Sequence, residues 1–387
     1  MDAADPSAIV RHAIALRHEL HRHPELSWQE RRSAELVRRE LSRLNIPWQP
    51  CAETGTLARL AAGRPGRHLA LRADLDALPI QECSGVAHAS CVPGVMHACG
   101  HDGHTACLLA AAAWLKAHEA VLPGPVTLLF QPAEEGGHGA RRMVEEGALR
   151  GVDAVFAFHN WSGLPAGAWA CPDGPVMAAN GEWTAVIRGR GGHAGSPHDC
   201  IDPLLAGAHF VVLAQQLVSR ATPPQQAAVV SVTMFHAGSA DNAIPDSAEL
   251  TGTIRAATSE RREALAAGLE RVLAAACAAS GARGELRYRP TYPATINHPA
   301  EAARARAALA AALGPAQGVS EGFPLMAAED FAYMLEACPG AYILLGTGHP
   351  EPCHSPRFDF DDRLIPAAMR LWAALAGLPP PAVAVGA

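Results

Sequence analysis

The chain has 387 residues, which exceeds what one hydrophobic core usually serves, so its length predicts two domains. Its composition is that of a globular protein, with 49% hydrophobic and 18% charged residues, and its net charge of −7 argues against a nucleic-acid-binding protein, which would carry a basic face. Lys116 is the single lysine and lies in a predicted helix, which excludes a pyridoxal-phosphate Schiff base or a P-loop, since both need a placed lysine.

The N-terminus has no basic segment followed by an apolar run, so we expect no signal peptide. No apolar stretch reaches the roughly 18 residues needed to span a membrane. Ten cysteines are scattered without a disulfide framework, which is typical of a reducing compartment. The sequence therefore predicts a cytoplasmic protein without a membrane partner.

Apolar positions at helical spacing predict helices over residues 7–23 and 29–44, separated by Pro24. Strands are predicted over residues 56–61 and 68–71, and the second runs into Asp74. An apolar helix is predicted over 103–120. Asp102 is a plausible N-cap for it.

Three more apolar strands are predicted over residues 126–130, 154–158 and 341–345, with a helix over about 138–146 between the first two. Helices between consecutive strands imply a largely parallel sheet, in which ligands bind beyond the carboxyl ends of the strands. The strand ends and following loops therefore gather seven candidate residues on one rim: Asp74, Cys99, His101, Glu134, Glu135, His159 and His354.

The pattern changes between residues 182 and 292, where the predicted order of elements is β-α-β-β-α-β. That order is the ferredoxin-like arrangement of an α+β domain. We therefore predict a discontinuous α/β domain over residues 1–181 and 293–387, with a smaller domain inserted over 182–292.

Residues 97–104 read HACGHDGH and combine three histidines, a cysteine and an aspartate, which are preferred ligands of zinc and similar metals. Five of the candidates are available as metal ligands: Cys99, His101, Glu135, His159 and His354. Five protein ligands are more than one zinc ion usually accepts, and this number suits two ions about 3.5–4 Å apart that share one ligand. Cys99 is the candidate bridge, because a thiolate can hold two such cations. Zinc is the default metal, and manganese, cobalt or nickel could also serve.

The adjacent residues Glu134 and Glu135 follow a predicted strand and a proline. Neighbouring carboxylates on a loop diverge, so one can bind metal while the other faces a metal-activated water. A glutamate beside such a water is the expected general base. An isolated Glu-Glu pair would more simply be a solvated turn, and the converging ligands are what favour the catalytic interpretation.

Together, residues 97–104, the segment QPAEEG at 131–136 and the segment HSPRFDF at 354–360 resemble the M20 metallopeptidase family. The similarity is to its amidohydrolases of N-acyl amino acids, such as hippurate hydrolases and auxin-conjugate hydrolases. It extends from His21 to Phe360. The resemblance implies a zinc-peptidase-like catalytic domain and the cleavage of an N-acyl amino acid, a small molecule, to a carboxylic acid and a free amino acid.

The resemblance also implies roles for individual residues. Glu134 matches the catalytic glutamate, and Asp74 is a supporting residue of the catalytic group at most, because Arg72-Ala73-Asp74 occupies the place of the family's His-x-Asp motif. The implied ligands of two divalent ions are Cys99, His101, Glu135, His159 and His354.

The inserted domain resembles the family's lid and dimerisation domain, which implies a homodimer or a higher homo-oligomer. His193 matches a lid histidine that reaches the substrate carbonyl, often in the partner subunit, and would be an oxyanion donor. Asn242 and Arg255 match residues that hold the substrate carboxylate, a task that suits an arginine fork. Taken alone, His193 would be a loop histidine and Arg255 a solvated strand end.

Several alternatives stay open. Deacetylation of an N-acetyl diamino acid is the nearest one, and a small-peptide hydrolase or a non-catalytic binding relative is less favoured. The segment Gly318–Gly322 fits G-x-S-x-G, but no strand precedes it and Pro324 opposes a following helix, so a serine hydrolase is rejected. Cys353, unusual beside His354, could be oxidation-prone or an adventitious ligand. Four histidines are expected to be supporting or surface residues: His97, His104, His138 and His198.

Overall fold

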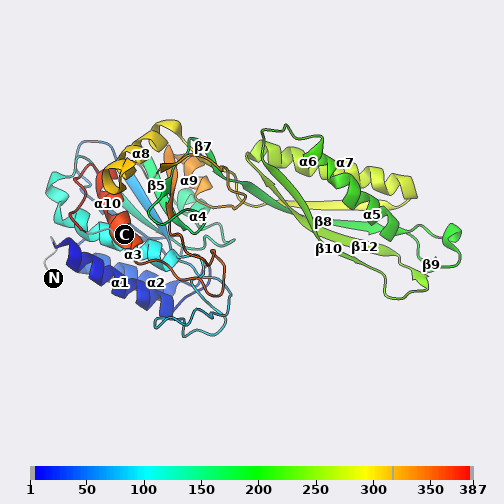
Figure 1. Ribbon diagram of the computed structural model, residues 1–387, viewed down its shortest axis with the longest axis horizontal. Helices are drawn as coiled ribbons and strands as arrows, with labels where there is room; N and C mark the ends of the chain where they lie inside the picture. The colour runs from blue at the N-terminus through cyan, green and yellow to red at the C-terminus, as the bar shows by residue number, and fades with distance from the viewer. Residues whose placement is uncertain (1–4, 316–317, 384–387) are drawn as a thin grey trace. The chain divides into compact units, whose positions relative to one another are not determined.

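The computed structural model describes residues 5–315 and 318–383 and divides the chain into two compact units (Figure 1). The first comprises Met1–Val176, Ile296–Gly322 and Asp330–Ala387, and the second comprises Met177–Thr295 and Phe323–Glu329. The inserted segment therefore begins and ends a few residues outside the predicted range of 182–292. A second, short segment, 323–329, also joins this unit, which the sequence pattern does not predict.

An eight-stranded mixed sheet, in the order β1-β2-β4-β3-β5-β16-β6-β15, forms the centre of the first unit. Its strands are β1 (Trp48–Cys51), β2 (Gly55–Leu60), β3 (Leu69–Asp74), β4 (Val126–Gln131), β5 (Ala154–Trp161), β6 (Trp169–Ala170), β15 (Gly318–Val319) and β16 (Gly340–Gly346).

The four central strands β4, β3, β5 and β16 are parallel to their neighbours within this group, and β1, β2 and β6 add antiparallel pairings around them. All residues of β3, β4 and β16 are buried, as expected for strands covered on both faces. The predicted α/β fold with a largely parallel sheet is confirmed. The parallel arrangement also brings the carboxyl ends of β3, β4, β5 and β16 to one edge, where the candidate ligands lie.

Helices cover the two faces of this sheet. They are α1 (Pro6–Arg22), α2 (Arg31–Arg43), α3 (His101–Ala117), α4 (Gly139–Glu145), α8 (Pro299–Leu313), α9 (Ala332–Ala337) and α10 (Leu364–Leu375), and the short 3₁₀ helix η1 (Glu119–Val121) follows α3.

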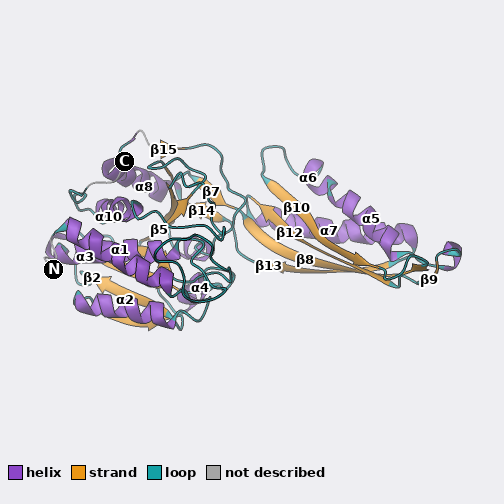
Figure 2. Ribbon diagram, turned by 60° about the horizontal axis from the view of Figure 1, so that its bottom comes forward, coloured by secondary structure: helices purple, strands orange, loops and turns teal. Residues whose placement is uncertain are grey.

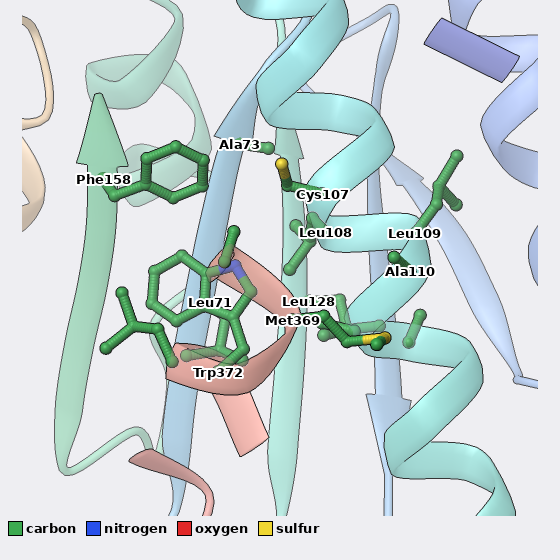
Figure 3. Close-up of a cluster of buried hydrophobic side chains, with 14 of the residues drawn as sticks. Leu71, Ala73, Cys107, Leu108, Leu109, Ala110, Leu128, Phe158, Met369 and Trp372 are labelled. Carbon is green, nitrogen blue, oxygen red and sulfur yellow. The ribbon is translucent and has the colours of Figure 1, made fainter. Parts of the chain in front are cut away.

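The main core lies where α3 and α10 pack on the central strands (Figure 3). Leu71 and Ala73 of β3 point into this core, and Trp372 of α10 fills it beside Phe158. Side chains alternate along a strand, so Arg72 points to the opposite face, where its guanidinium lies 5.8 Å from the ring of Phe331 at the start of α9.

The second unit contains a four-stranded antiparallel sheet in the order β10-β12-β8-β13, with α5 and α7 along one face (Figure 2). Its main elements are β8 (Ala179–Arg188), α5 (Pro203–Ala214), α6 (Gln216–Ser219), β10 (Ala228–Ala237), β12 (Ser247–Ala256), α7 (Ser259–Ser280) and β13 (Arg283–Pro290). This order of elements along the chain and in the sheet is the ferredoxin-like arrangement.

Short elements complete the two units. They are β7 (Gly174–Met177), β9 (Gly192–His193), η2 (Pro197–Asp199), β11 (Ala243–Ile244) and β14 (Thr295–Asn297).

The second unit has its own core, built on the alternation of buried residues along β8. Trp183 of β8 meets Phe210 of α5 edge to face, with ring centroids 5.6 Å apart. The boundaries of α5 and α7 follow from local chemistry, because Asp202 and Thr258 cap them and Gly281, with φ of 75°, ends α7. Among the described residues, no helix combines the length and hydropathy needed to cross a lipid bilayer.

Candidate metal centre

Two loops and two strand ends meet at the carboxyl edge of the parallel strands. Cys99 precedes α3, and His101 is the first residue of that helix. His159 lies near the end of β5, and Glu134 and Glu135 follow β4. His354 lies in the loop after β16, and its backbone N–H donates to the carbonyl of Ala98 at 2.7 Å.

Gly100 allows Cys99 and His101 to face the same space. Its φ of 93° is in the left-handed region, and a Cβ at this position would lie 2.2 Å from Oδ1 of Asn160. Helix α3 therefore begins at His101 with Gly100 as its N-cap. The prediction that Asp102 is the N-cap was wrong. Asp102 is instead buried in the first turn, where His21 Nδ1 donates to its Oδ2 at 2.8 Å.

The candidate ligands form two overlapping groups. Ligand atoms of Cys99, His101 and His159 all lie within 4.8 Å of one another, and so do those of Cys99, Glu135 and His354. Cys99 belongs to both groups, and its Sγ lies 3.3 Å from Nε2 of His159. The predicted five-residue ligand set is thus brought together, with the thiol between its two halves.

The ring nitrogens of two histidines are poised to bind a cation. His159 donates from Nδ1 to the carbonyl of Asn160 at 2.6 Å, so Nε2 carries the lone pair that faces Cys99. His101 donates from Nδ1 to Oδ1 of Asp76 at 3.3 Å. Its Nε2 is buried and makes no hydrogen bond to any described residue. A buried ring nitrogen without a hydrogen-bond partner, beside a thiol and carboxylates, fits a metal ion.

The electrostatics of the pocket also favour the binding of a cation. Burial lowers the pKa of His159 well below its usual value and keeps that ring neutral, as a ligand requires. Burial acts in the same direction on His101, but the carboxylates of Asp74 and Asp76 outweigh it and raise its pKa to about 10. Without a metal, the carboxylates favour the protonated, positively charged form of His101. A bound divalent ion would supply that positive charge instead, and His101 could then bind the ion in its neutral form.

Asp76 is the residue that sequence reasoning missed. One oxygen of its carboxylate accepts the backbone N–H of Glu134 at 3.0 Å, and the other accepts that of Glu135 at 2.9 Å. It also bonds to His101 and accepts the hydroxyl of Ser27 at 2.7 Å. Asp76 therefore orients a candidate ligand and holds the loop that carries the candidate base. Its position two residues beyond Asp74, at the end of a buried strand, was the signal that could have found it.

Asp74 lies behind the pocket rather than in it. Its Oδ1 accepts from Nδ1 of His104 at 2.7 Å, its Oδ2 accepts from Arg72 at 2.7 Å, and Oδ2 is 3.7 Å from Nε2 of His101. Since His104 is also held through Nε2 by Asn160, neither of its nitrogens is available to a metal.

Glu134 and Glu135 diverge, as predicted for neighbouring carboxylates. Oε1 of Glu135 lies 3.2 Å from Nε2 of His354. Oε1 of Glu134 accepts the backbone N–H of Asp330 at 3.3 Å. The side chain of Asp330 is itself buried, where it accepts from Arg72 and Gln131. A network from β3 and β4 therefore fixes the segment that orients Glu134.

The other histidines of interest take no part in the ligand groups. His97 is buried, and burial lowers its pKa to about 4, while its ring nitrogens make no hydrogen bond to a described residue. His138 lies 3.1 Å from the hydroxyl of Tyr333, and His198 is exposed.

Three predicted substrate-contacting residues lie in the second unit. His193 is exposed on β9, and its Nδ1 accepts the backbone N–H of Gly195 at 3.0 Å. Asn242 is exposed just before β11. Arg255 is partly buried near the end of β12 and donates to the carbonyl of Ile254 at 3.0 Å. Their roles stay predictions.

Comparisons with known proteins identify the family of the chain. A family described as "Peptidase family M20/M25/M40" matches residues 70–377. An N-acetylcysteine deacetylase of Bacillus subtilis is 40% identical over 365 residues, covering 94% of this chain and 95% of that protein. An IAA-amino acid hydrolase ILR1-like 4 of Arabidopsis thaliana is 38% identical over 373 residues, covering 94% and 84%.

A solved structure is also similar over nearly its full length. It is a Bacillus subtilis protein described as a dinuclear metal binding peptidase from the M20 family, with a TM-score of 0.84 and 36% identity, covering 96% of this chain and 98% of that one.

Proposed function

Because the chain belongs to peptidase family M20/M25/M40, a family of hydrolases, we propose that it cleaves N-acyl amino acids to a carboxylic acid and a free amino acid. The observation that carries the proposal is the position of Cys99 in both ligand groups, with Glu134 beside them. One relative is named as an N-acetylcysteine deacetylase and another as an IAA-amino acid hydrolase. Both names describe N-acyl amino acids as substrates, which supports this substrate class, but the two acyl groups differ and so leave the acyl group of this chain's substrate open.

The proposed holders of two divalent ions are Cys99, His101, Glu135, His159 and His354. When bound, such ions supply Lewis acidity that lowers the pKa of a water molecule and polarises an amide carbonyl. The mixed sulfur, nitrogen and oxygen donors favour zinc as the bound metal, and manganese, cobalt and nickel are the alternatives.

Glu134 is the proposed general base. Its Oε1 accepts the N–H of Asp330, which orients the carboxylate. The carboxylate takes a proton from the attacking water and passes it to the nitrogen of the departing amino acid, so that the C–N bond breaks with a neutral leaving group. Asp76 keeps this residue in place through the backbone N–H of Glu134.

The second unit is proposed to supply the contacts that recognise the substrate. His193 would donate a hydrogen bond to the oxyanion that develops from the amide carbonyl. Arg255 and Asn242 would bind the carboxylate of the amino acid. Substrates would therefore share a free α-carboxylate.

Metal analysis combined with a substrate panel tests this function. The panel varies the acyl group (acetyl, benzoyl, indole-acetyl) and the amino acid separately, and it includes an N-acetyl diamino acid and a dipeptide. We expect hydrolysis of N-acyl amino acids by metal-loaded protein and none of the matching amides that lack a carboxylate. Hydrolysis of only the diamino acid derivative would favour the deacetylase alternative. Metal binding without hydrolysis of any member would favour a binding protein.

A homodimer through the second unit is the proposed assembly. Strand β10 is an edge of the four-stranded sheet, and Met234 and Phe235 on it are exposed. On α5, Leu204, Leu205 and Val212 are also exposed. An unpaired edge beside exposed apolar side chains is a common site of association.

Light scattering of the wild type and of Val212→Glu tests this assembly, with Val121→Glu, an exposed valine of the first unit, as the matched control. We expect a dimer that Val212→Glu weakens and Val121→Glu does not. A monomeric wild type would refute the proposal.

Mixing two inactive variants tests whether His193 acts in the partner's site. Random dimers of Glu134→Gln and His193→Ala would contain one complete site in each heterodimer if His193 acts across the interface. Activity should then recover to about a quarter of the wild-type value, since half the dimers are mixed and half their sites are complete. No recovery in verified heterodimers would place His193 in its own subunit's site.

A further inference from the structure

Cys353 lies beside Cys99 although 254 residues separate them in the chain. The backbone hydrogen bond from His354 to Ala98 joins the two loops at 2.7 Å. The Cys353 Sγ lies 4.0 Å from the backbone carbonyl oxygen of Cys99. The sulfur of one cysteine thus lies against the backbone of the other, on two loops joined by a hydrogen bond, which brings the pair into the range where a disulfide can be tested.

The two cysteines differ in access. Cys99 is 8% exposed, whereas Cys353 is partly exposed and its sulfur accepts from Nδ2 of Asn160 at 3.6 Å. Cys353 is therefore the more accessible of the two cysteines to a small oxidant. The proposed mechanism uses the Cys99 thiolate and gives Cys353 no task.

We propose that Cys99 and Cys353 form a reversible disulfide that withdraws Cys99 from the metal centre. The inference rests on the proposed metal-binding role of Cys99. A sulfur atom in a disulfide is no longer a thiolate and cannot hold two cations together. Oxidation would thus separate the two ligand groups that now share this residue.

The chemistry is an ordinary thiol–disulfide exchange with a low-molecular-weight disulfide. The Cys353 sulfur attacks one sulfur of the small disulfide, forms a mixed disulfide and releases one small thiol. The Cys99 sulfur then attacks the Cys353 sulfur, closes the Cys99–Cys353 bond and releases the second small thiol. Two protein thiols are oxidised and one small disulfide is reduced to two thiols, and excess dithiol reverses both steps.

The metal-loaded protein treated with 2-hydroxyethyl disulfide provides the test. Three quantities are followed: the Cys99–Cys353 cross-link by peptide mapping without reduction, metal release to a chromogenic chelator, and hydrolysis of an N-acyl amino acid. We expect the cross-link, metal release and inactivation to proceed together, and dithiothreitol with added metal to restore activity.

Three variants make the experiment specific. Cys353→Ser should lose the cross-link and release metal roughly tenfold more slowly under the same oxidant. Cys91→Ser, the same change at an exposed cysteine that lies beside His23, should behave like the wild type. Cys99→Ala should trap the mixed disulfide on Cys353, which needs no bound metal to be detected.

Metal release from Cys353→Ser at the wild-type rate, or oxidation of the wild type without a Cys99–Cys353 cross-link, would overturn the proposal. The cross-link is read independently of catalysis. A protein that forms it but hydrolyses no panel member would therefore count against the proposed function and not against this disulfide.

Discussion

The metal pocket of the first unit and the candidate substrate residues of the second differ in how they are held. His101, Asp74 and Asp76 are completely or almost completely buried. Asp74 and Asp76 each accept hydrogen bonds from several elements, and His101 donates one to Asp76. His193 and Asn242 are exposed on short turns and strands. Buried polar groups need partners, and those partners fix their geometry before any ligand arrives.

This contrast separates two kinds of contribution. Residues of the pocket act from a preorganised position, so replacing one should change metal affinity, the chemical step or stability. The exposed residues of the second unit make few contacts that stabilise the fold. Replacing one of them should therefore change catalysis, while metal content and stability stay at their wild-type values. The following variants test that division, beginning with the largest expected effect.

Glu134→Gln should separate chemistry from structure inside the pocket. The amide keeps the shape and can still meet the N–H of Asp330, but it cannot take a proton, so kcat should fall by roughly 10³-fold. Metal content, measured by elemental analysis, should not change. Glu145→Gln, on the exposed side of α4, is the control. Full activity of Glu134→Gln would remove it as the base.

His193→Ala applies the same logic to the second unit. If His193 stabilises the oxyanion, kcat should fall by roughly 10²-fold while metal content and melting temperature match the wild type. His198→Ala, an exposed histidine of the same unit, should leave all three quantities unchanged. A lower melting temperature in His193→Ala would show a structural role and break the comparison.

Sequence reasoning predicted the ligands but not their support, for a physical reason. Cys99, His101, Glu135, His159 and His354 are residue types with distinctive chemistry at strand ends, and the structure brings them together. The α/β fold followed from buried strands separated by helices. The long elements were predicted best, and α1 spans Pro6–Arg22 where the helical spacing predicted residues 7–23.

The support depends on contacts between distant segments, which composition and periodicity do not encode. Asp76 bonds to backbone N–H groups 58 and 59 residues away, and Asp102 looked like a helix cap because its partner, His21, lies in another helix. Short strands such as β6 and β15 have two residues each and no readable period. The return of 323–329 to the second unit is likewise a tertiary feature.

Asp76→Asn sharpens the comparison at the missed residue. The single amide oxygen cannot accept the backbone N–H groups of both Glu134 and Glu135, as the two carboxylate oxygens do. The neutral amide also removes the negative charge that stabilises the hydrogen bond from His101 Nδ1. Metal affinity should fall by about 10- to 100-fold in a competition titration, with activity partly restored by excess metal. Asp173→Asn, an exposed aspartate, is the control. Unchanged affinity would contradict the positioning role.

Arg255→Ala should affect substrate binding more than turnover. Removing a charged contact to the carboxylate should raise KM by about tenfold, with kcat changed less and metal content unchanged. Arg287→Ala, on the exposed side of β13, serves as the control. A fall in kcat with an unaltered KM would indicate that Arg255 acts on the transition state and not on the bound carboxylate.

His21 provides the smallest expected effect on catalysis, because its ring nitrogens bond to Asp102 and Glu82 and not to a candidate ligand. Burial opposes protonation of His21, but Asp102 and Glu82 outweigh it and raise its pKa from 6.5 to about 9. A histidine whose pKa is raised in the folded state contributes stability that is fully present below pH 6.5 and lost as the pH rises through about 9.

His21→Gln should therefore lower the free energy of unfolding most at pH 6, by about 2 to 3 kcal/mol, and progressively less toward pH 9.5. Urea unfolding of wild type and variant across this range measures the difference, and His209→Gln, an exposed histidine of the second unit, should show none of it. A difference independent of pH would mean that His21 contributes packing and not charge. The buried network would then fix the first turn of α3 by shape, and the contrast between the two units would lose its electrostatic part.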